Sequence, residues 1–326
     1  MSKGARFLGG IVAATMLAHP ALAQDFPDRP INIVVSGAVG GSIDNMARQL
    51  IQFWEPAIGK GFTIENKDGA GGITGVRYFL GRPDDGYNLL ICTAAHAAAA
   101  IAKTAGMSTS DIDAINVQQF DPTTIVVRAD SRFKTIDDLI KEAKAKPNTL
   151  TWGSPAVGMA QMVGKLFARS LGIQVRFVPQ DSGAASDTAI LGGHVDYRLG
   201  TAAGDFAELG DKVRILAITG PKRLPFIPNV PIMDELAKNH SLSQPIPYLG
   251  TGRLVVVHPS LKTKHPERYK KLVETYKVAF HSAGYQDVLK KTGQANATQF
   301  MEPAEANKLF RSFVDDAVKY GKELGK

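Results

Sequence analysis

The sequence contains one cysteine, Cys92, among its 326 residues. A single cysteine cannot form an internal disulfide, and it cannot supply the several thiolates of a structural zinc or iron–sulfur site. Stability must therefore come from a hydrophobic core. The 44% of hydrophobic residues, over a chain of this length, are enough for two α/β lobes.

Sequence signatures of common enzymes are also missing. There is no G-x-S-x-G elbow and no H-E-x-x-H, and Gly37–Ser42 lacks the Gly-Lys-Ser/Thr ending of a phosphate-binding loop. Six histidines follow residue 23 and show no paired metal spacing within a helix: His96, His194, His240, His258, His265 and His281. Lysines and arginines are scattered along the chain, without a basic stripe between aromatics. We expect no catalysis, no metal, no cofactor and no nucleic acid.

Long apolar runs are absent beyond the first residues of the chain. Lys3 and Arg6 precede the apolar stretch Phe7–Ala18, and Ala21–Ala23 has the small-x-small pattern that signal peptidase cuts. A dozen apolar residues are too few for the roughly 30 Å hydrocarbon core of a membrane. The pattern predicts a signal peptide over residues 1–23, cleaved after Ala23, and export to the periplasm. Cleavage lowers the formal net charge from +7 to +5, which mildly favours anionic ligands.

A strand, a turn of small residues and a helix follow one another twice. Ile31–Val35 leads into Ser36–Ser42, and Leu150–Trp152 leads into Gly153–Gly158. A helix start leaves backbone N–H groups unpaired and carries roughly half a positive charge, so small residues there let an anion approach. Two such ends facing each other would hold a carboxylate without any catalytic side chain.

Alternating strand and helix patterns from Ile31 onward predict an α/β fold with largely parallel sheets. The expected strands are Ile31–Val35, Thr63–Glu65, Leu89–Cys92, Thr124–Val127, Leu150–Trp152, Val175–Val178, Val213–Ile218 and Arg253–Val257. The expected helices include Ile43–Trp54, Ile136–Lys146, Glu267–Ala283 and Met159–Leu171, the last ended by Gly172. Because the sequence has no long linker, we expect the chain to cross between two lobes more than once, near residues 120–127 and 245–255. This predicts residues 24–121 plus 246–326 as lobe 1, residues 122–245 as lobe 2, and a ligand cleft between them.

Several motifs occur in an order that carries a family resemblance: Asp25–Ile31, Gly40–Asp44, Glu65–Gly75, Pro83–Leu90, Gly153–Gly158, Leu191–Asp196 and Ile215–Arg223. Together they closely resemble the extracytoplasmic solute receptors of tripartite tricarboxylate transporters, the Bug (Bordetella uptake gene) family. The resemblance implies a two-lobed periplasmic-binding-protein-like fold of type II. Each lobe would be a mainly parallel sheet flanked by helices. It also implies a monomer that captures a small di- or tricarboxylate and delivers it to membrane permease subunits.

Ligand-binding residues are carried over from the family by matching motifs. They are Ser36, Ala38, Val39, Gly40, Gly41, Ser42, Thr93, His96, Ser154, Ala156, Val157, Gly158 and Asp196. Other roles stay open: Gly40 and Gly41 could simply permit a tight turn, and His96 could be an interior histidine. Asp196 would either face the ligand or orient water or a loop. Asp44 is expected to favour the helix dipole, and Gly69–Gly75 and Asp84–Gly86 to form turns.

Two departures from the family pattern concern specificity. Ser36 and Gly37 replace the usual proline and aromatic residue, and Pro179–Gly183 replaces a tyrosine-lysine-glycine run. The missing aromatic wall and cation predict a larger carboxylate, such as the aromatic dicarboxylate terephthalate. Arg128, Arg176 or Arg198 would supply the charge. A periplasmic sensor that presents its carboxylate to a membrane histidine kinase is the alternative, because transport and sensing both need ligand-driven closure.

Overall fold

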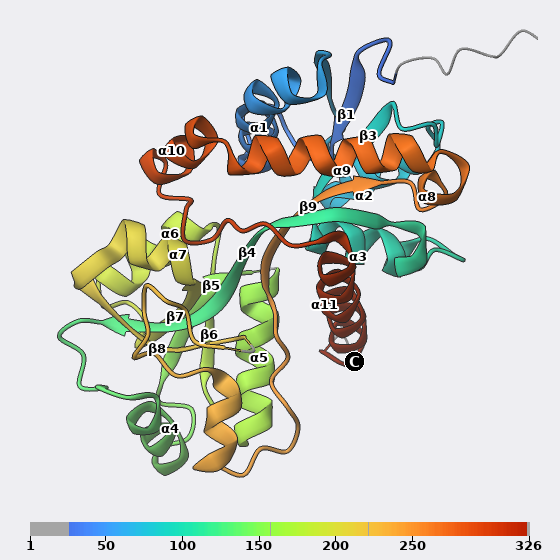
Figure 1. Cartoon of the computed structure of the whole chain (residues 1–326). Helices are drawn as coiled ribbons and strands as arrows, with labels where there is room; N and C mark the ends of the chain where they lie inside the picture. The colour runs from blue at the N-terminus through green and yellow to red at the C-terminus, as the bar shows by residue number, and fades with distance from the viewer. Residues whose placement is uncertain (1–25, 157, 221, 325–326) are drawn as a thin grey trace, which may run out of the picture.

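A computed structural model describes residues 26–156, 158–220 and 222–324 of the chain. It has two lobes joined by extended strands (Figure 1). The predicted signal peptide, residues 1–23 with cleavage after Ala23, lies outside the described residues. In the described part, none of the helices is both long and apolar enough to cross a membrane.

The first lobe is built on strands β1 (Ile31–Val35), β2 (Phe62–Asn66), β3 (Asn88–Thr93) and β9 (Gly250–Val257). β2, β1 and β3 are parallel neighbours in that order, and β9 runs antiparallel to β3. β1 and β3 are almost wholly buried, as expected of apolar strands covered on both faces by helices.

Strand β4 (Asp113–Arg128) belongs to both lobes. Its first part pairs antiparallel with β9 as far as Pro122 opposite Gly250. From Thr123 opposite Thr201 onward it pairs with β7 (Tyr197–Thr201), and it also pairs with β8 (Val213–Ile218). In Figure 1 this strand runs from the upper lobe into the lower one.

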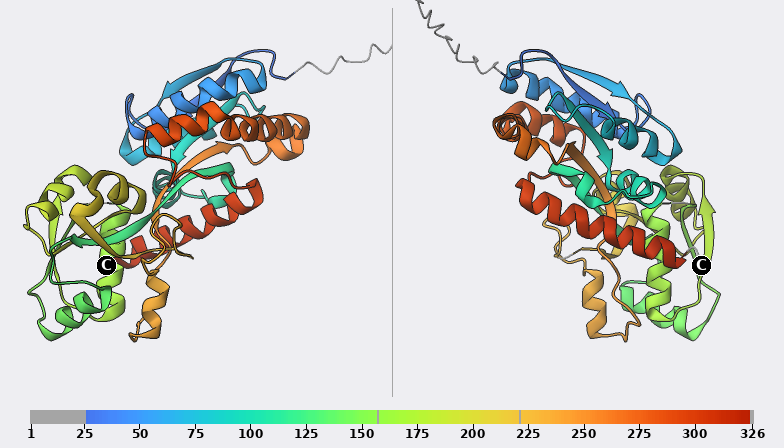
Figure 2. Two further views of the ribbon diagram at one scale, coloured as in Figure 1. Left: turned by 60° about the vertical axis from the view of Figure 1, so that its left-hand side comes forward. Right: turned by 90° about the vertical axis from the view of Figure 1, so that its right-hand side faces the viewer.

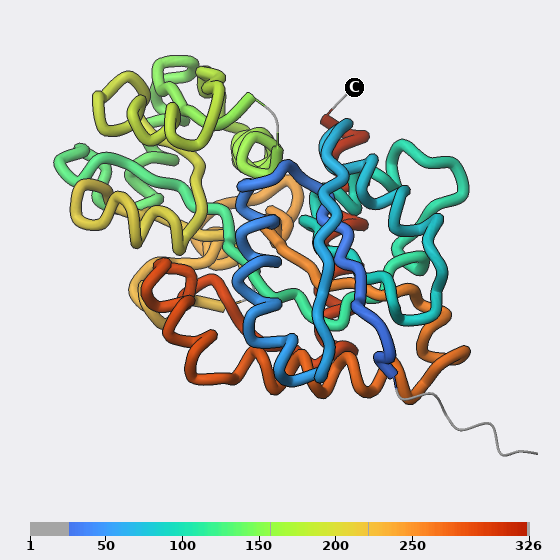
Figure 3. Tube along the Cα trace, turned by 90° about the horizontal axis from the view of Figure 1, so that it is seen from above, coloured from blue at the N-terminus to red at the C-terminus, as the bar shows by residue number. Residues whose placement is uncertain are grey.

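The second lobe continues the sheet with β5 (Thr151–Pro155) and β6 (Arg176–Gln180). β6, β5 and β7 are parallel, whereas β7 and β8 are antiparallel to β4. β2, β1 and β3 in the first lobe and β6, β5 and β7 in the second are thus parallel, as the sequence predicts. β9 is antiparallel to β4, because the chain returns to the first lobe along the path by which it crossed. In Figure 3 the green and yellow segments of this lobe gather to one side of the blue and orange segments.

Helices cover both faces of the sheet in the first lobe, and other helices pack on the strands of the second lobe. The longer helices are α1 (Ser42–Ile58), α2 (Ile73–Leu80), α3 (Ala94–Lys103), α4 (Ile136–Ala145), α5 (Met159–Leu171), α6 (Gly183–Leu191), α9 (Pro266–His281), α10 (Ala283–Lys291) and α11 (Pro303–Leu324). Shorter ones are η1 (Ala70–Gly72), η2 (Thr109–Asp111), α7 (Ala202–Gly204), the π-helical turn η3 (Asp205–Leu209), η4 (Gly210–Lys212), η5 (Met233–Lys238) and α8 (Leu261–Lys264). α1 packs on α9 and α10, and α11 packs on α3 and β4 and also touches α5 (Figure 2).

Large buried side chains fix these helices on the sheets. Trp54 of α1 is fully buried, lies edge-on to Tyr276 of α9 with ring centroids 5.2 Å apart, and donates a hydrogen bond to Thr275 Oγ1 at 3.0 Å. In the second lobe α5 approaches β5 so closely that a Cβ on Gly164 would lie 2.3 Å from the Trp152 ring. Only glycine fits there, so this contact sets how near α5 comes to the strand.

Candidate functional site

A cleft of about 440 Å³ lies where strand ends of both lobes meet. It is bordered by the ends of β3, β5 and β7, the beginning of β9, and the first turns of α3, α5 and α6. Its lining is formed by Thr93, Ala95, Thr123, Pro155, Met159, Ala160, Gly183, Ala184, Asp187, Arg198, Leu199, Gly200, Thr201, Gly204, Asp205, Glu208, Gly250, Thr251 and Gly252. Carboxyl ends of strands and amino ends of helices are the usual place for a ligand in an α/β fold.

The three helix starts at the cleft differ in how their N–H groups are engaged. Thr93 caps α3 by accepting a hydrogen bond from His96 N at 3.1 Å, and Ser182 caps α6 by accepting one from Ala185 N at 3.2 Å. α5 follows Gly158, which has a φ of +116° and no side chain to act as a cap. The start of α5 therefore keeps the most donor capacity for a bound anion.

The second predicted turn, Gly153–Gly158, reaches the cleft through one of its own residues and two that follow it. Pro155, Met159 and Ala160 line the cleft. Ser154 is fully buried and donates its hydroxyl hydrogen bond to the carbonyl of Pro155, and Ala156 N donates to Gln180 O at 3.1 Å. Val157 lies outside the described residues.

The first predicted turn uses two of its amides internally. Gly40 N donates to Asp44 Oδ2 at 2.8 Å, and Gly41 N donates to Ala38 O at 3.1 Å. Gly40 adopts a φ of +76°, which supports the tight-turn reading of this residue. Neither Ser42 nor Val39, whose side chain is 72% exposed, is among the residues that line the cleft.

Asp44 has a larger role than that of a charge near a helix dipole. It is fully buried, and its carboxylate accepts hydrogen bonds from Gly40 N at 2.8 Å, Arg48 Nε at 2.9 Å and Asn66 Nδ2 at 3.0 Å. Burial opposes ionisation, yet the bonds from Arg48, Gly40 and Asn66 hold the pKa of Asp44 below its usual range. Asp44 thus fastens the first turn to α1 and β2.

Ser36 and His96 form a pair behind the first turn. Ser36 Oγ lies 2.8 Å from His96 Nδ1, and burial lowers the pKa of His96. The neighbouring glycine cluster makes room for this pair: a Cβ on Gly72 would lie 2.1 Å from His96 Cγ, and one on Gly75 would lie 2.5 Å from Ser36 Cα. Gly69–Gly75 is therefore more than a turn, and this close packing has no signature in sequence spacing. Neither Ser36 nor His96 lines the cleft.

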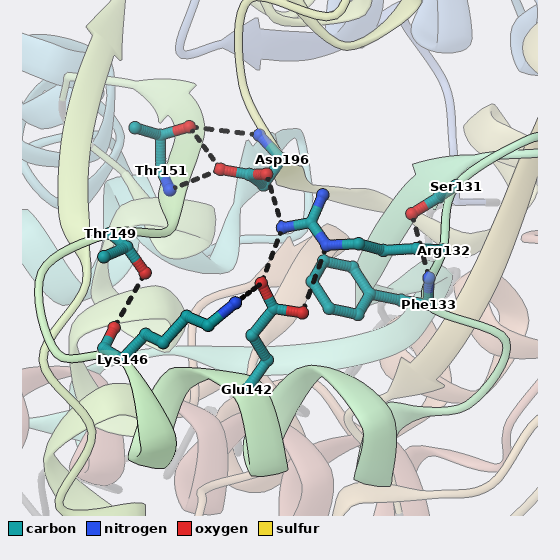
Figure 4. Close-up of polar contacts among 8 residues, drawn as sticks. All are labelled: Ser131, Arg132, Phe133, Glu142, Lys146, Thr149, Thr151 and Asp196. Carbon is teal, nitrogen blue, oxygen red and sulfur yellow. Dashed lines mark hydrogen bonds and ion pairs between the residues drawn. The ribbon is translucent and has the colours of Figure 1, made fainter.

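Asp196 immediately precedes β7, at the other end of the strand from Thr201, which lines the cleft. Its Oδ2 accepts hydrogen bonds from Thr151 N and Thr151 Oγ1, both at 2.9 Å, and its Oδ1 pairs with Arg132 at 3.2 Å (Figure 4). Arg132 also pairs with Glu142 of α4 at 3.0 Å. Both carboxylate oxygens of Asp196 are thus used to join β5, β7 and α4.

The three candidate arginines lie in different places. Arg128 donates to Asp130 Oδ1 at 2.8 Å through its Nε, and Arg176 is exposed at the start of β6. Arg198 is 5% exposed and lines the cleft. Its Nη2 contacts Oδ1 of Asp205 and lies 2.7 Å from Oδ1 of Asp187. The place and contacts of each arginine depend on residues of other elements, and sequence patterns do not specify these contacts.

Asp205 is the most deeply buried acid of the cleft. Burial raises the pKa of Asp205 to about 7, against the opposing influence of Arg198 and of a hydrogen bond from Thr124. A neighbouring hollow of about 480 Å³ shares Thr201, Gly204, Glu208 and Thr251 with the cleft and adds Asp121 and Arg253. Burial also raises the pKa of Asp121, which accepts a hydrogen bond from Ala203 N at 2.8 Å.

The described ranges contain no group of three or more His, Cys, Asp or Glu side chains placed to hold a metal ion. What the cleft offers is helix N–H groups, hydroxyls such as those of Thr93 and Thr201, and a few charged side chains. Such a lining can bind a small polar molecule.

Residues 46–323 match the model of the "Tripartite tricarboxylate transporter family receptor" family, TctC, and the chain belongs to this family. A Cupriavidus necator relative, "UPF0065 protein in gbd 5'region", is 31% identical over 97% of this chain and 94% of its own length. A ligand-free TctC solute binding protein from Polaromonas superposes with a TM-score of 0.79 at 20% identity, covering 91% of this chain and 99% of that one. MatC from Rhodopseudomonas palustris, solved with bound malate, gives 0.65 at 19% identity, covering 90% and 99%.

Proposed function

We propose that this chain is a periplasmic receptor that captures a small carboxylate in the cleft between its lobes. It delivers that ligand to the permease subunits of a tripartite tricarboxylate transporter. Family membership and the malate bound to the neighbour MatC support this function. The observation that carries it is the start of α5, which opens on the cleft after Gly158 without a capping side chain.

Affinity would come from several donors acting together. Micromolar capture needs about 8 kcal/mol. A helix terminus contributes about 0.3 to 2 kcal/mol to a nearby charge, and a charge-assisted hydrogen bond roughly 1.5 to 3 kcal/mol. Three or four amide and hydroxyl donors, brought together in a cleft that excludes water, would supply the required free energy. No single side chain needs to dominate.

The carried-over contacts form part of the proposal. In it the first turn, through Ala38, Val39 and Ser42, meets the ligand when the lobes close, and Thr93 meets it from the start of α3. The lobe boundaries, 24–121 plus 246–326 and 122–245, are proposed with it. The change of β4 partner between Pro122 and Thr123 supports them.

Calorimetric titration of the purified protein tests the function. The ligands are succinate, malate, citrate, adipate and terephthalate, so the panel includes the aromatic dicarboxylate that the sequence predicts. We expect one ligand per chain with micromolar affinity for at least one small carboxylate. Heat of binding that is absent for all of them, with the protein folded, would refute a carboxylate receptor of this kind.

Two substitutions at one position of the cleft, one charged and one neutral, test whether an anionic ligand binds there. A Cβ on Gly183, the first residue of α6, would meet no atom within 4 Å, so a side chain fits there. Gly183→Asp adds a carboxylate that suits a helix start and repels an anionic ligand. Gly183→Asn has the same shape without the charge. We expect Gly183→Asp to bind at least about tenfold more weakly than Gly183→Asn, which corresponds to about 1.4 kcal/mol. Equal affinities would place the ligand elsewhere.

A further inference from the structure

The cleft carries more negative than positive side chains. Among its described lining residues, one cation, Arg198, faces three carboxyl groups, those of Asp187, Asp205 and Glu208. Backbone N–H groups can hold a carboxylate without a cation, but a negative excess beside a ligand with two or three carboxylates is unfavourable, because like charges in a partly buried site repel.

Arg198 is already committed to protein partners. Its guanidinium contacts Asp205 and Asp187, and its side chain is almost fully buried. Its Nη1 donates to the carbonyl of Leu199 at 3.4 Å, and its Nε is buried without a hydrogen-bond partner among the described residues, so at most two N–H groups are left for a ligand oxygen. The remaining N–H groups of a guanidinium whose charge is already neutralised cannot balance two additional negative charges.

Protonation of Asp205 does not reverse this balance. Because burial raises the pKa of Asp205 to about 7, part of its charge is lost at neutral pH. Even with Asp205 neutral, Asp187 and Glu208 outnumber Arg198. The adjoining hollow adds Arg253 together with Asp121, so it brings no clear positive excess.

Glu208 is the acid most available to a ligand. It is exposed on the π-helical turn η3 and lines both the cleft and the adjoining hollow. Its carboxylate makes no hydrogen bond or ion pair with any residue that the structure describes, whereas Asp187 is held against Arg198. Because this carboxylate is exposed and has no protein partner among the described residues, a ligand N–H group can replace the water that hydrates it.

We infer that the ligand carries one carboxylate and, at its other end, a hydrogen-bond donor such as a primary amide or an ammonium group. The carboxylate lies at the uncapped start of α5, and the donor faces Glu208 and Asp187. This inference rests on the proposed function and narrows its substrate class. It favours an amido- or amino-carboxylate over the aromatic dicarboxylate that the sequence predicts.

Pairs of ligands that differ at one end test the inference. Succinate is compared with succinamate, and terephthalate with 4-carbamoylbenzoate, by calorimetry at pH 7.5 in fixed salt. Each pair keeps its skeleton and exchanges one carboxylate for an amide. We expect the amide of at least one pair to bind more tightly than its diacid by about tenfold or more.

Removal of the acceptor charge identifies the residue responsible. Glu208→Gln is expected to reduce the preference for amide over diacid at least about threefold, because the diacid gains and the amide loses. Glu274→Gln, at an exposed position of α9, is the matched control and should leave the ratio unchanged.

The outcomes separate the inference from the function on which it rests. If the diacid binds at least as tightly as its amide in both pairs, the inference is overturned and the carboxylate receptor stays intact. A preference for the amide that Glu208→Gln leaves unchanged overturns the role of Glu208. If neither member of any pair binds, and the dicarboxylates of the wider panel do not bind either, the proposed function itself fails.

Discussion

Asp44→Asn is expected to destabilise the first lobe, because Asp44 organises the turn between β1 and α1. The wild-type carboxylate is 1% exposed and accepts from Gly40 N at 2.8 Å, Arg48 Nε at 2.9 Å and Asn66 Nδ2 at 3.0 Å. An amide of the same shape has one accepting oxygen and one NH₂ group. Whichever way it is oriented, a donor of the amide is set against a donor of the protein.

The magnitude follows from these contacts. A hydrogen bond to a charged group contributes about 1.5 to 3 kcal/mol, and a buried donor without an acceptor costs about 1 to 3 kcal/mol. The bond from Arg48 contributes less, because that side chain is 48% exposed and its charge is screened by water. We therefore expect Asp44→Asn to lower the free energy of unfolding by about 2 to 4 kcal/mol.

Urea unfolding followed by tryptophan fluorescence measures this loss. Trp54 reports on the first lobe and Trp152 on the second, and both are buried. Asp315→Asn, an exposed position on α11, is the matched control and should change the unfolding free energy by less than about 0.5 kcal/mol. A midpoint for Asp44→Asn equal to that of Asp315→Asn would refute the reasoning.

The pH dependence gives a second check on Asp44. Its folded-state pKa is held below the ordinary value of 3.8, so the ionised carboxylate stabilises the fold above that value. This contribution disappears as the pH falls through the folded-state pKa. The stability advantage of the wild type over Asp44→Asn should therefore be constant near neutral pH and shrink below about pH 4.

Two further predictions concern tight packing and a buried acid. Gly75→Ala should lower the free energy of unfolding by about 2 to 4 kcal/mol, because its Cβ would lie 2.5 Å from Ser36 Cα. Gly183→Ala should be tolerated, because its Cβ would have no atom within 4 Å. Equal stabilities of the two variants in urea unfolding would contradict this prediction. Burial raises the folded-state pKa of Asp205 from 3.8 to about 7. The protonated acid therefore stabilises the fold fully below the pKa of the unfolded chain, and this stabilisation is lost as the pH rises through the folded-state pKa. Relative to Asp205→Asn, the wild type should lose roughly 1 kcal/mol per pH unit between about pH 4 and 7, and parallel stability profiles would exclude the shift.

Local patterns predicted much of the fold. β1 and β8 have the predicted bounds, α4 ends one residue before its predicted end, and α5 ends at Gly172 in a left-handed conformation with φ of +63°. These elements are specified by apolar periodicity, a capping threonine or a terminal glycine, all of which act over a few residues.

Other parts of the fold were missed for different physical reasons. Strand β7 carries Gly200, a residue that strands disfavour, and its pairing with β4 and β5 outweighs that local preference. α11 had a readable signal, since Phe310, Phe313, Val314 and Ala317 recur at helical spacing and are buried. A scan of the C-terminal segment for this period would have found it.

The candidate site was predictable only in part. Thr93 lines the cleft, and so do residues in and just after the second turn, because helix starts at strand ends follow from the fold. The pairing of Ser36 with His96 and of Arg198 with Asp187 and Asp205 depends on tertiary contacts between separate elements. Spacing in one sequence does not encode such contacts.

The pairing of β9 with β3 and β4 also bears on the order of assembly. β9 is synthesised after every strand of the second lobe, yet it fills the place between β3 and β4 in the first. Until β9 arrives, the edge of β3 has free N–H and C=O groups that can join a strand of another molecule. Protection of the nascent chain from aggregation should therefore matter most while this last strand is still missing, and a chain truncated before Gly250 should associate with itself.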